Sequence, residues 1–240
     1  FFGIIIGALS TLIPIYLIEI SPPKMVGLFG STYQTAVFFG NVVCDLAGNY
    51  LDWKDVSYIG GGISLLFLFM IWFLPDSPES KHHTQTIDNS NPQAPNKLSL
   101  AKSRNSIFHR DYIQQISICI LLVFFQTSTG FFLFRENIPY VFKEVDLIFP
   151  ELMSYSISEM TLVIFSIIGS ILNQVTGREV PFSISSFGIC IPLIIQAISL
   201  KVEMPKSISF FTHHCYFAFY SFSLAIYPCV AAAELFPTKT

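Results

Sequence analysis

Two glutamines and two glutamates of this chain stand out because they occur in or beside long apolar runs. Gln34 and Gln126 lie inside such runs, and a glutamine amide both donates and accepts hydrogen bonds without carrying charge. Taken alone, their simplest role is a hydrogen bond between two helices. Glu19 and Glu234 each end an apolar run and lie three residues before a proline. A parallel repeat of two halves would produce this match, and so would chance, since both features are common at helix ends.

Catalytic and metal-binding patterns are not evident. His82 and His83 form one adjacent pair of histidines, and His213 and His214 form another. Neighbouring residues on a helix do not face one site, so neither pair indicates a metal site. The five cysteines lie in or beside apolar runs without a C-x-x-C pair, which indicates small buried side chains. The sequence has no G-x-S-x-G, H-E-x-x-H or phosphate-binding glycine loop. We therefore expect no metal, no cofactor and no enzyme activity.

One charged pair needs a separate interpretation. Arg135 and Glu136 close the fourth apolar run. A charge in the middle of a bilayer is costly and usually functional, whereas at a helix end it reaches the water interface. The position at the end of the run favours the interfacial interpretation.

The composition indicates a membrane protein. Hydrophobic residues make up 52% of the 240 residues and charged residues 12%, whereas soluble domains carry about 25% charged residues. The mean hydropathy of +0.59 points the same way. The net charge of -3 gives no reason to expect a nucleic-acid partner, so the expected environment is a lipid bilayer.

Seven apolar runs are long enough for helices that cross about 30 Å of hydrocarbon. Backbone groups in lipid must pair internally, so each run is predicted to be helical and the fold all-α. The runs are approximately Phe1–Ile18, Val26–Leu46, Ser57–Leu74, Ile113–Phe134, Met153–Leu172, Phe182–Leu200 and Ile208–Val230. They divide the chain into a first half (residues 1–75, three spans), a polar linker (76–111) and a second half (112–240, four spans).

The distribution of lysine and arginine predicts the orientation. With alternating sides, most basic residues fall on the side of the polar linker, while the opposite side is rich in acids. The linker, Glu19 and Glu234 are therefore predicted to be cytoplasmic. The plasma membrane is the default location, since no sorting signal is visible.

Several short motifs follow one another along the chain, with the spacings G-x-x-x-G, P-x-Y-x-x-E-x-S-P and G-x-x-G-x-x-x-Q. They are formed by Gly3, Gly7, Pro14, Tyr16, Glu19, Ser21, Pro22, Gly27, Gly30 and Gln34. This order of motifs resembles the sugar porters of the major facilitator superfamily. Later blocks follow in family order at Pro75–Pro78, Gln126–Gly130, Gly177–Arg178 and Ala233–Pro237. The resemblance implies an incomplete major-facilitator-type bundle of about seven transmembrane helices, from the family's fourth helix to just past its tenth. The chain would then be a fragment.

The resemblance also implies a function. Such proteins move a hexose or related polyol by alternating access, either by facilitated diffusion or with protons as the coupling ion. The implied substrate-binding residues are Gln34, Gln126, Thr127 and Thr161. Several polar positions of the family are lost, since Phe132 and Leu162 stand where it has asparagines and Cys229 where it has a tryptophan.

The same resemblance implies a cytoplasmic gate and helix-bending positions. The gate consists of Glu19, Arg178 and Glu234, and bending is assigned to Pro14, Gly130, Pro139 and Pro228. Val26 and Glu79 occupy positions where the family has arginines. Because lost ion pairs shift a conformational equilibrium, we expect the inward-open state to be favoured.

Two alternatives remain open at this point. The first is a truncated relative that no longer transports, since polar site residues are eroded. The second is a seven-helix receptor, which fits the helix count but explains neither the wide linker nor the repeated glutamate and proline pattern.

The gate hypothesis can be tested by restoring both arginines. Val26→Arg combined with Glu79→Arg should increase labelling of a cysteine on the outward face, because the restored pairs would close the cytoplasmic side. Unchanged labelling would count against the hypothesis.

Overall fold

The computed structural model describes residues 2–22, 25–75, 110–138, 151–199, 201–202, 205–228 and 230–231. Within these ranges the secondary structure is helical and contains no strand, which confirms the predicted all-α fold. Residues 76–109 of the predicted linker (76–111) and the positions of Glu79, Pro139 and Glu234 lie outside the described residues.

The described helices form seven units, three of them composite. They are α1 (Phe2–Glu19), α2 (Val26–Tyr50), α3 (Trp53–Met70) with a 3-10 turn η1 (Ile71–Phe73), α6 (Arg110–Ser128) with α7 (Phe131–Glu136), α9 (Glu151–Thr176), α10 (Glu179–Ser199), and α11 (Lys206–Phe219) with a π-helix η2 (Tyr220–Leu224). Their order agrees with the seven apolar runs.

Helix ends differ from the predicted ends of the apolar runs. The second span continues to Tyr50 rather than Leu46, and the third begins at Trp53 rather than Ser57. An acidic residue, Asp55, lies in the first turn of α3, where the helix dipole favours negative charge. Apolarity marks the part of a helix that lies in hydrocarbon, and helices continue beyond it into the polar interface.

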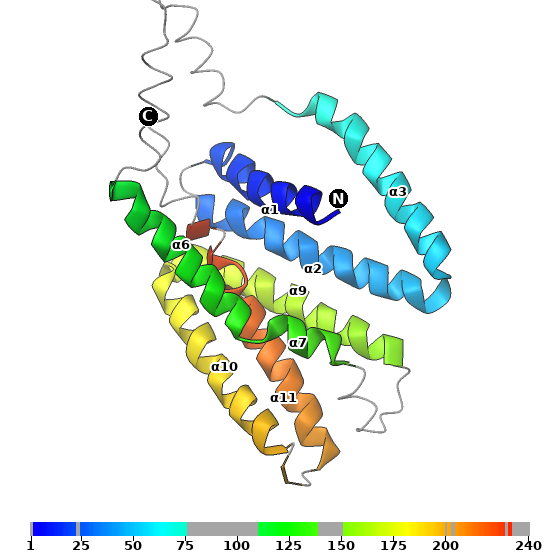
Figure 1. Ribbon diagram of the computed structural model, residues 1–240, viewed down its shortest axis with the longest axis vertical. Helices are drawn as coiled ribbons and strands as arrows, with labels where there is room; N and C mark the ends of the chain where they lie inside the picture. Colours follow the sequence, from blue (N-terminus) through cyan, green and yellow to red (C-terminus); the bar gives the residue numbers. More distant parts are fainter. Residues whose placement is uncertain are drawn as a thin grey trace, which may run out of the picture.

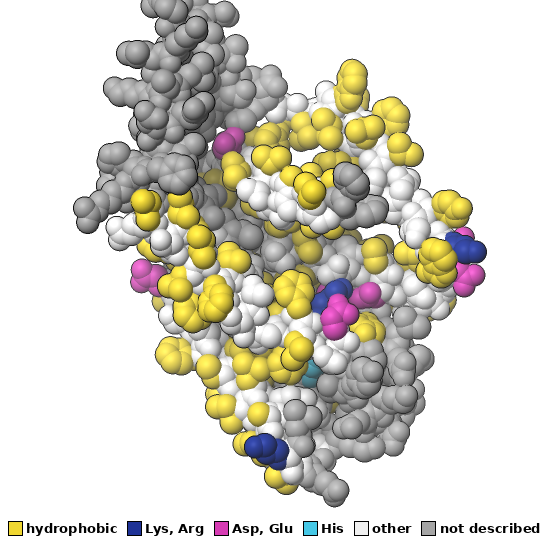
Figure 2. Space-filling view, in the orientation of Figure 1, with side chains coloured by type: hydrophobic (Ala, Val, Ile, Leu, Met, Phe, Trp, Pro, Cys, Tyr) yellow, Lys and Arg dark blue, Asp and Glu magenta, His cyan; other side chains and the backbone are white. Residues whose placement is uncertain are grey.

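Four helical segments are long and apolar enough to cross a membrane: 53–73, 113–136, 155–176 and 179–199. α3 is the extreme case, since its apolar window has no buried residue and Trp72 and Phe73 are 88% and 87% exposed. Figure 2 shows apolar side chains spread over the visible face of the molecule. Such an apolar surface fits contact with lipid or with other helices, and soluble monomers rarely expose one of this size to water.

The two halves meet where α2 packs along α9. α1 lies beside α2, and α3 extends away from the bundle (Figure 1). α10 and α11 pack together and against α9, completing the second half. The buried core includes Phe38 of α2, Leu162 of α9 and Phe217 of α11, so it spans both halves.

Two glycines permit the close approach of helices in the second half. A Cβ at Gly169 of α9 would overlap the backbone carbonyl of Phe222, and a Cβ at Gly188 of α10 would overlap the Phe219 ring. Helices in membranes commonly use small residues in this way, because lipid provides no hydrophobic drive for association. The position of η2 thus depends on residues without side chains.

The two ends of the bundle are distinguished by their contacts. Gly30, near the start of α2, faces both Ile18 of α1 and Val230 of the last span. We call this the Arg178 end, since Arg178 also approaches the start of α2 at Gly27. The opposite end, where α2 finishes, is the Tyr50 end.

The contact at Gly169 predicts a large effect from one methyl group. Gly169→Ala should lower the free energy of unfolding by about 1–3 kcal/mol, because α9 and η2 would have to separate. Thermal unfolding in detergent measures the change. Gly48→Ala is the matched control, since nothing described lies within 4 Å of that position. Equal stability of wild type and Gly169→Ala would contradict the packing.

Candidate functional site

The sixth and seventh helices form one span with a break at Gly130. Gly130 has a φ of +81°, a left-handed conformation that glycine adopts without strain. The Thr129 hydroxyl donates to the Gln126 carbonyl at 2.7 Å, and the Phe134 amide donates to the Gly130 carbonyl at 2.9 Å. The chain therefore ends one helix and starts another within two residues, with Gln126 one turn before the break.

The Gln126 amide reaches from this span to the last one. Its Nε2 atom lies 3.3 Å from the Ala225 carbonyl oxygen and 3.5 Å from the Tyr220 hydroxyl. In this structure the side chain thus makes an interhelical hydrogen bond, and it remains half-buried.

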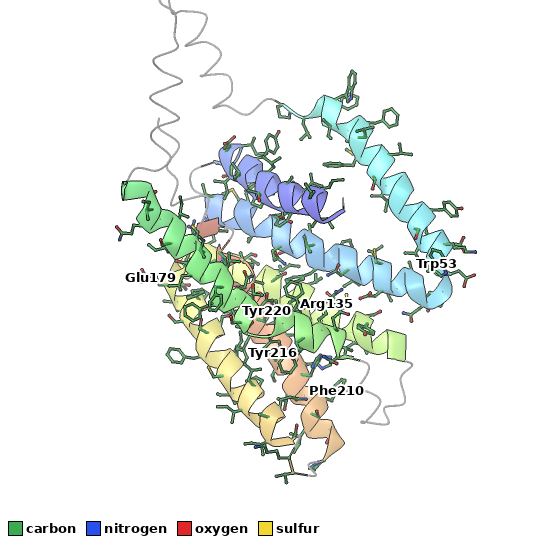
Figure 3. The ribbon with its side chains drawn as sticks, in the orientation of Figure 1. Trp53, Arg135, Glu179, Phe210, Tyr216 and Tyr220 are labelled. Carbon is green, nitrogen blue, oxygen red and sulfur yellow. The ribbon has the colours of Figure 1, made fainter. Side chains whose placement is uncertain are left out.

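Aromatic rings from three helices surround the break. Phe131 stacks on Tyr220 with ring centroids 4.2 Å apart, and Phe38 of α2 lies 6.5 Å from Phe131. The Tyr216 hydroxyl donates to the Thr129 carbonyl at 3.2 Å. Figure 3 shows Tyr216 and Tyr220 at the junction of α6 and α7. We call the four residues Phe38, Phe131, Tyr216 and Tyr220 the aromatic cluster, and Gln126 lies beside it.

The π-helix η2 places Tyr220 and Ala225 in this cluster. Its wide turn directs the Ala225 amide to the Tyr220 carbonyl at 3.0 Å, which removes the usual acceptor of the Leu224 amide. Ser185 of α10 compensates, since its Oγ accepts from the Leu224 amide at 3.2 Å and donates to the Phe219 carbonyl. π-Helical turns often mark functional sites, because they cost regular hydrogen bonds.

The other predicted binding residues lie in different surroundings. Gln34 is half-buried one helical turn before Phe38, so it shares the α2 face that contacts the aromatic cluster. Thr161 is half-buried, and its hydroxyl donates to the Ile157 carbonyl of its own helix. Thr127 is exposed and donates to the Val123 carbonyl, so the structure does not bring it into the cluster. Leu162 is fully buried and apolar.

At the Arg178 end, Arg178 approaches the start of α2. A Cβ at Gly27 would lie 3.7 Å from the Arg178 Nη2 atom, and both residues line a small cavity with Asn173 and Tyr227. Partial burial lowers the pKa of Arg178, and the nearby Tyr227 acts in the opposite direction. A guanidinium remains protonated in proteins, so Arg178 brings a positive charge to α2. Glu19 is half-buried at the same end.

Two of the predicted bending prolines lie in helical segments. Pro14 is buried within α1, and Pro228 is buried in the helical turn after η2. Gly130 has a positive φ and η2 is a π-helix, so both positions depart from regular α-helical geometry.

The ion pair between Arg135 and Glu159 was not predicted from the sequence. Arg135 was expected to extend to the water interface, and this is wrong: its Nε atom lies 2.6 Å from Oε1 of Glu159, whose side chain is 1% exposed. Glu136 does lie in the exposed setting expected, at 76% exposure. The signal was present, since Glu159 is the single charged residue of the predicted span Met153–Leu172. A lone acid in an apolar run calls for a basic partner.

These helices define a membrane-transporter fold of the major facilitator type. The structure is similar to that of the xylose transporter XylE from E. coli in a partially occluded inward-open conformation, with a TM-score of 0.67 and 20% identity over 97% of this chain and 60% of that one. The family model described as Sugar (and other) transporter matches residues 1–240. The chain therefore belongs to the sugar transporter family and is an integral membrane protein.

Curated relatives agree with this family. Sugar transporter ERD6-like 12 of Arabidopsis thaliana is 25% identical over 98% of this chain and 57% of its own length. The facilitated trehalose transporter Tret1 of Apis mellifera ligustica is 21% identical over 99% and 53%. Facilitated glucose transporter member 6 of solute carrier family 2 in Mus musculus is 24% identical over 75% and 40%. The chain spans about half the length of these relatives.

The role of Ser185 predicts a specific cost for its removal. Ser185→Ala should destabilise the protein by about 1–3 kcal/mol, because the Leu224 amide would be left without an acceptor. Thermal unfolding is the measurement. Ser183→Ala in the same helix is the control, since its hydroxyl is exposed and bonds only the Glu179 carbonyl one turn earlier. If both variants unfold alike, Ser185 does not support η2.

Proposed function

We propose that this chain contributes to the movement of a hexose or related polyol across a membrane by alternating access. The observation that carries the proposal is the position of Gln126, which is half-buried beside the aromatic cluster at the break between α6 and α7. Its family and its fold support transport of a sugar-like solute.

The chemistry of the site suits a neutral polyhydroxylated ligand. Every hydroxyl that leaves water needs a partner, and burying one unpaired costs about 1–3 kcal/mol. The Gln126 amide can both donate and accept, and its present partners are a hydroxyl and a carbonyl that a sugar can imitate. Tyr216 and Tyr220 add hydroxyl groups to the same region. Gln34 is proposed to contribute from the α2 side.

Fewer amides than in the wider family favour a ligand with fewer polar contacts. Phe132 is 61% exposed and Leu162 is buried, and neither can bond a hydroxyl. Thr161 is the polar group nearest in sequence to Leu162, and it is proposed to compensate by rotating its hydroxyl away from Ile157. Thr127 is proposed as a binding residue only in a conformation that turns it toward the cluster.

The architecture also suits a change of access. α2 belongs to the first half and α9 to the second, so their contact is where the halves would move. The break at Gly130 allows α7 to reorient separately from α6. At the Arg178 end, Glu19, Arg178 and Glu234 are proposed to close the path on the cytoplasmic side. The plasma membrane is the proposed location, and protons are the candidate coupling ion.

Uptake by the full-length protein in proteoliposomes tests the proposal. Radiolabelled hexoses and polyols should show saturable uptake, and Gln126→Ala should raise the half-saturating concentration by about tenfold, since one hydroxyl loses its partner. Gln114→Ala is the control, because Gln114 is exposed on the same helix. Absence of saturable uptake for every sugar and polyol would contradict the proposal.

The alternative functions gain no support from these findings. The relatives reported above are all named as transporters, and none is named as a receptor. A relative that has lost transport would show no saturable uptake even with Gln126 intact, and the same assay measures this.

A further inference from the structure

Three charged side chains from three helices gather in the part of the bundle nearest the Tyr50 end. They are Asp45 of α2, Arg135 of α7 and Glu159 of α9. Figure 2 shows a basic side chain flanked by acidic ones on a largely apolar face, and Figure 3 places Arg135 there. We call Asp45, Arg135 and Glu159 the charged cluster. It is separate from the aromatic cluster and from the gate residues.

One contact within the charged cluster is a direct ion pair, and Asp45 acts on it through its charge. Arg135 Nε and Glu159 Oε1 are 2.6 Å apart, with Glu159 1% exposed. Asp45 lies close enough for its charge to act on both Arg135 and Glu159, and the Asn41 side chain approaches the Glu159 carboxylate from α2. The cluster thus joins one helix of the first half to two helices of the second.

The two carboxylates lie at different distances from their helix ends. Glu159 lies eight residues after the first residue of α9, about 12 Å along the helix. Asp45 lies five residues before the end of α2, about 8 Å from that end, so it is the carboxylate nearer to its helix end.

The charges of this cluster do not balance. Asp45 and Glu159 supply two carboxylates, and Arg135 supplies one guanidinium, which leaves one excess negative charge. Asp45 Oδ2 and Glu159 Oε2 are both buried, and neither has a hydrogen-bond partner among the described residues. Burying an unpaired charge away from water is expensive, and a proton on one carboxyl would remove the charge and provide an O–H donor.

Among the described residues, the neighbouring helices carry one more carboxylate close to the cluster and two histidines on α11. Glu136 is 76% exposed and lies 3.9 Å from Arg135, where water can solvate it. On α11, His213 and His214 lie against the aromatic rings of Phe134 and Phe210.

The remaining helices that pack on α2 and α9 carry their charges near helix ends. Lys54 and Asp55 are exposed at the start of α3, and Asp52 is exposed just before it. Glu19 ends α1 and Glu179 begins α10, both at the Arg178 end.

We propose that Asp45 and Glu159 together hold one proton beside Arg135, and that this proton-binding site links the two halves of the transporter. The ligand is a proton taken from water at the Tyr50 end, and it forms an O–H bond on one carboxylate oxygen. The link to transport rests on the proposed function, whereas the proton site itself does not.

Opening of the Tyr50 end would change the number of bound protons. Moving α2 away from α7 and α9 would bring Asp45 into water as a carboxylate, and would leave Arg135 and Glu159 as a balanced pair. The closed arrangement therefore binds one more proton than the open one, and acidic conditions favour closure at this end. Since such coupling is reciprocal, closure also draws in a proton.

Infrared difference spectroscopy of the full-length protein in liposomes, without any sugar, tests the site. Between pH about 8 and about 4, the wild type should gain a carboxylic C=O band from a group shielded from water. Asp45→Asn and Glu159→Gln should each abolish the whole band, because either change leaves one carboxylate balanced by Arg135. Two independent acids would instead lose half of the band in each variant.

Two further variants complete the test. Glu136→Gln should leave the band unchanged, because Glu136 is solvated, and Arg135→Gln should enlarge it, because two carboxylates would then lack a counter-ion. Asp45→Asn alone decides the matter if Glu159→Gln does not fold. A wild type without the band, or an unchanged band in Asp45→Asn, overturns the proposal. Loss of sugar uptake with the band intact would overturn the proposed function instead.

Discussion

The packing of α2 along α9 is the interaction on which the rest of the molecule depends. It joins the two halves, and α2 contacts Arg178, the aromatic cluster and the charged cluster along its length. At the Arg178 end it brings Gly27 to Arg178, in the middle it presents Phe38 to Phe131, and toward the Tyr50 end it brings Asp45 to the charged cluster. One stripe of α2 thus contacts three different chemical environments.

Unpaired backbone groups constrain the second half equally strongly. In lipid every amide and carbonyl needs a partner inside the protein, and η2 breaks the regular pattern. Ser185 restores the bond of the Leu224 amide, and Gln126 takes up the Ala225 carbonyl. Gly169 provides the space for the wide turn. The irregular helix therefore persists because neighbouring helices satisfy it, and it holds Tyr220 against Phe131.

The sequence predicted the spans better than the contacts between them. Apolar runs located all seven helical segments, and four of these are long and apolar enough to cross a membrane. The π-turn at Tyr220 and the close approach at Gly169 depend on how helices pack together. The sequence of one apolar run does not show which helix packs against it. Arg135 shows the difference: its place at the end of a run suggested water, while its partner Glu159 lies 24 residues away in the chain. The amides at Gln34 and Gln126 were identifiable, but their partners were not.

The break at Gly130 has a mechanical consequence. α7 is six residues long, with Phe131 at its first residue and Arg135 four residues later, about 6 Å along the axis. A helix this short turns as one rigid piece, with the left-handed glycine as its pivot. Any tilt of this piece that disturbs the ring stacked on Tyr220 must also displace the guanidinium bound to Glu159. The Phe131–Tyr220 stack and the Arg135–Glu159 ion pair are therefore mechanically coupled through a single turn of helix.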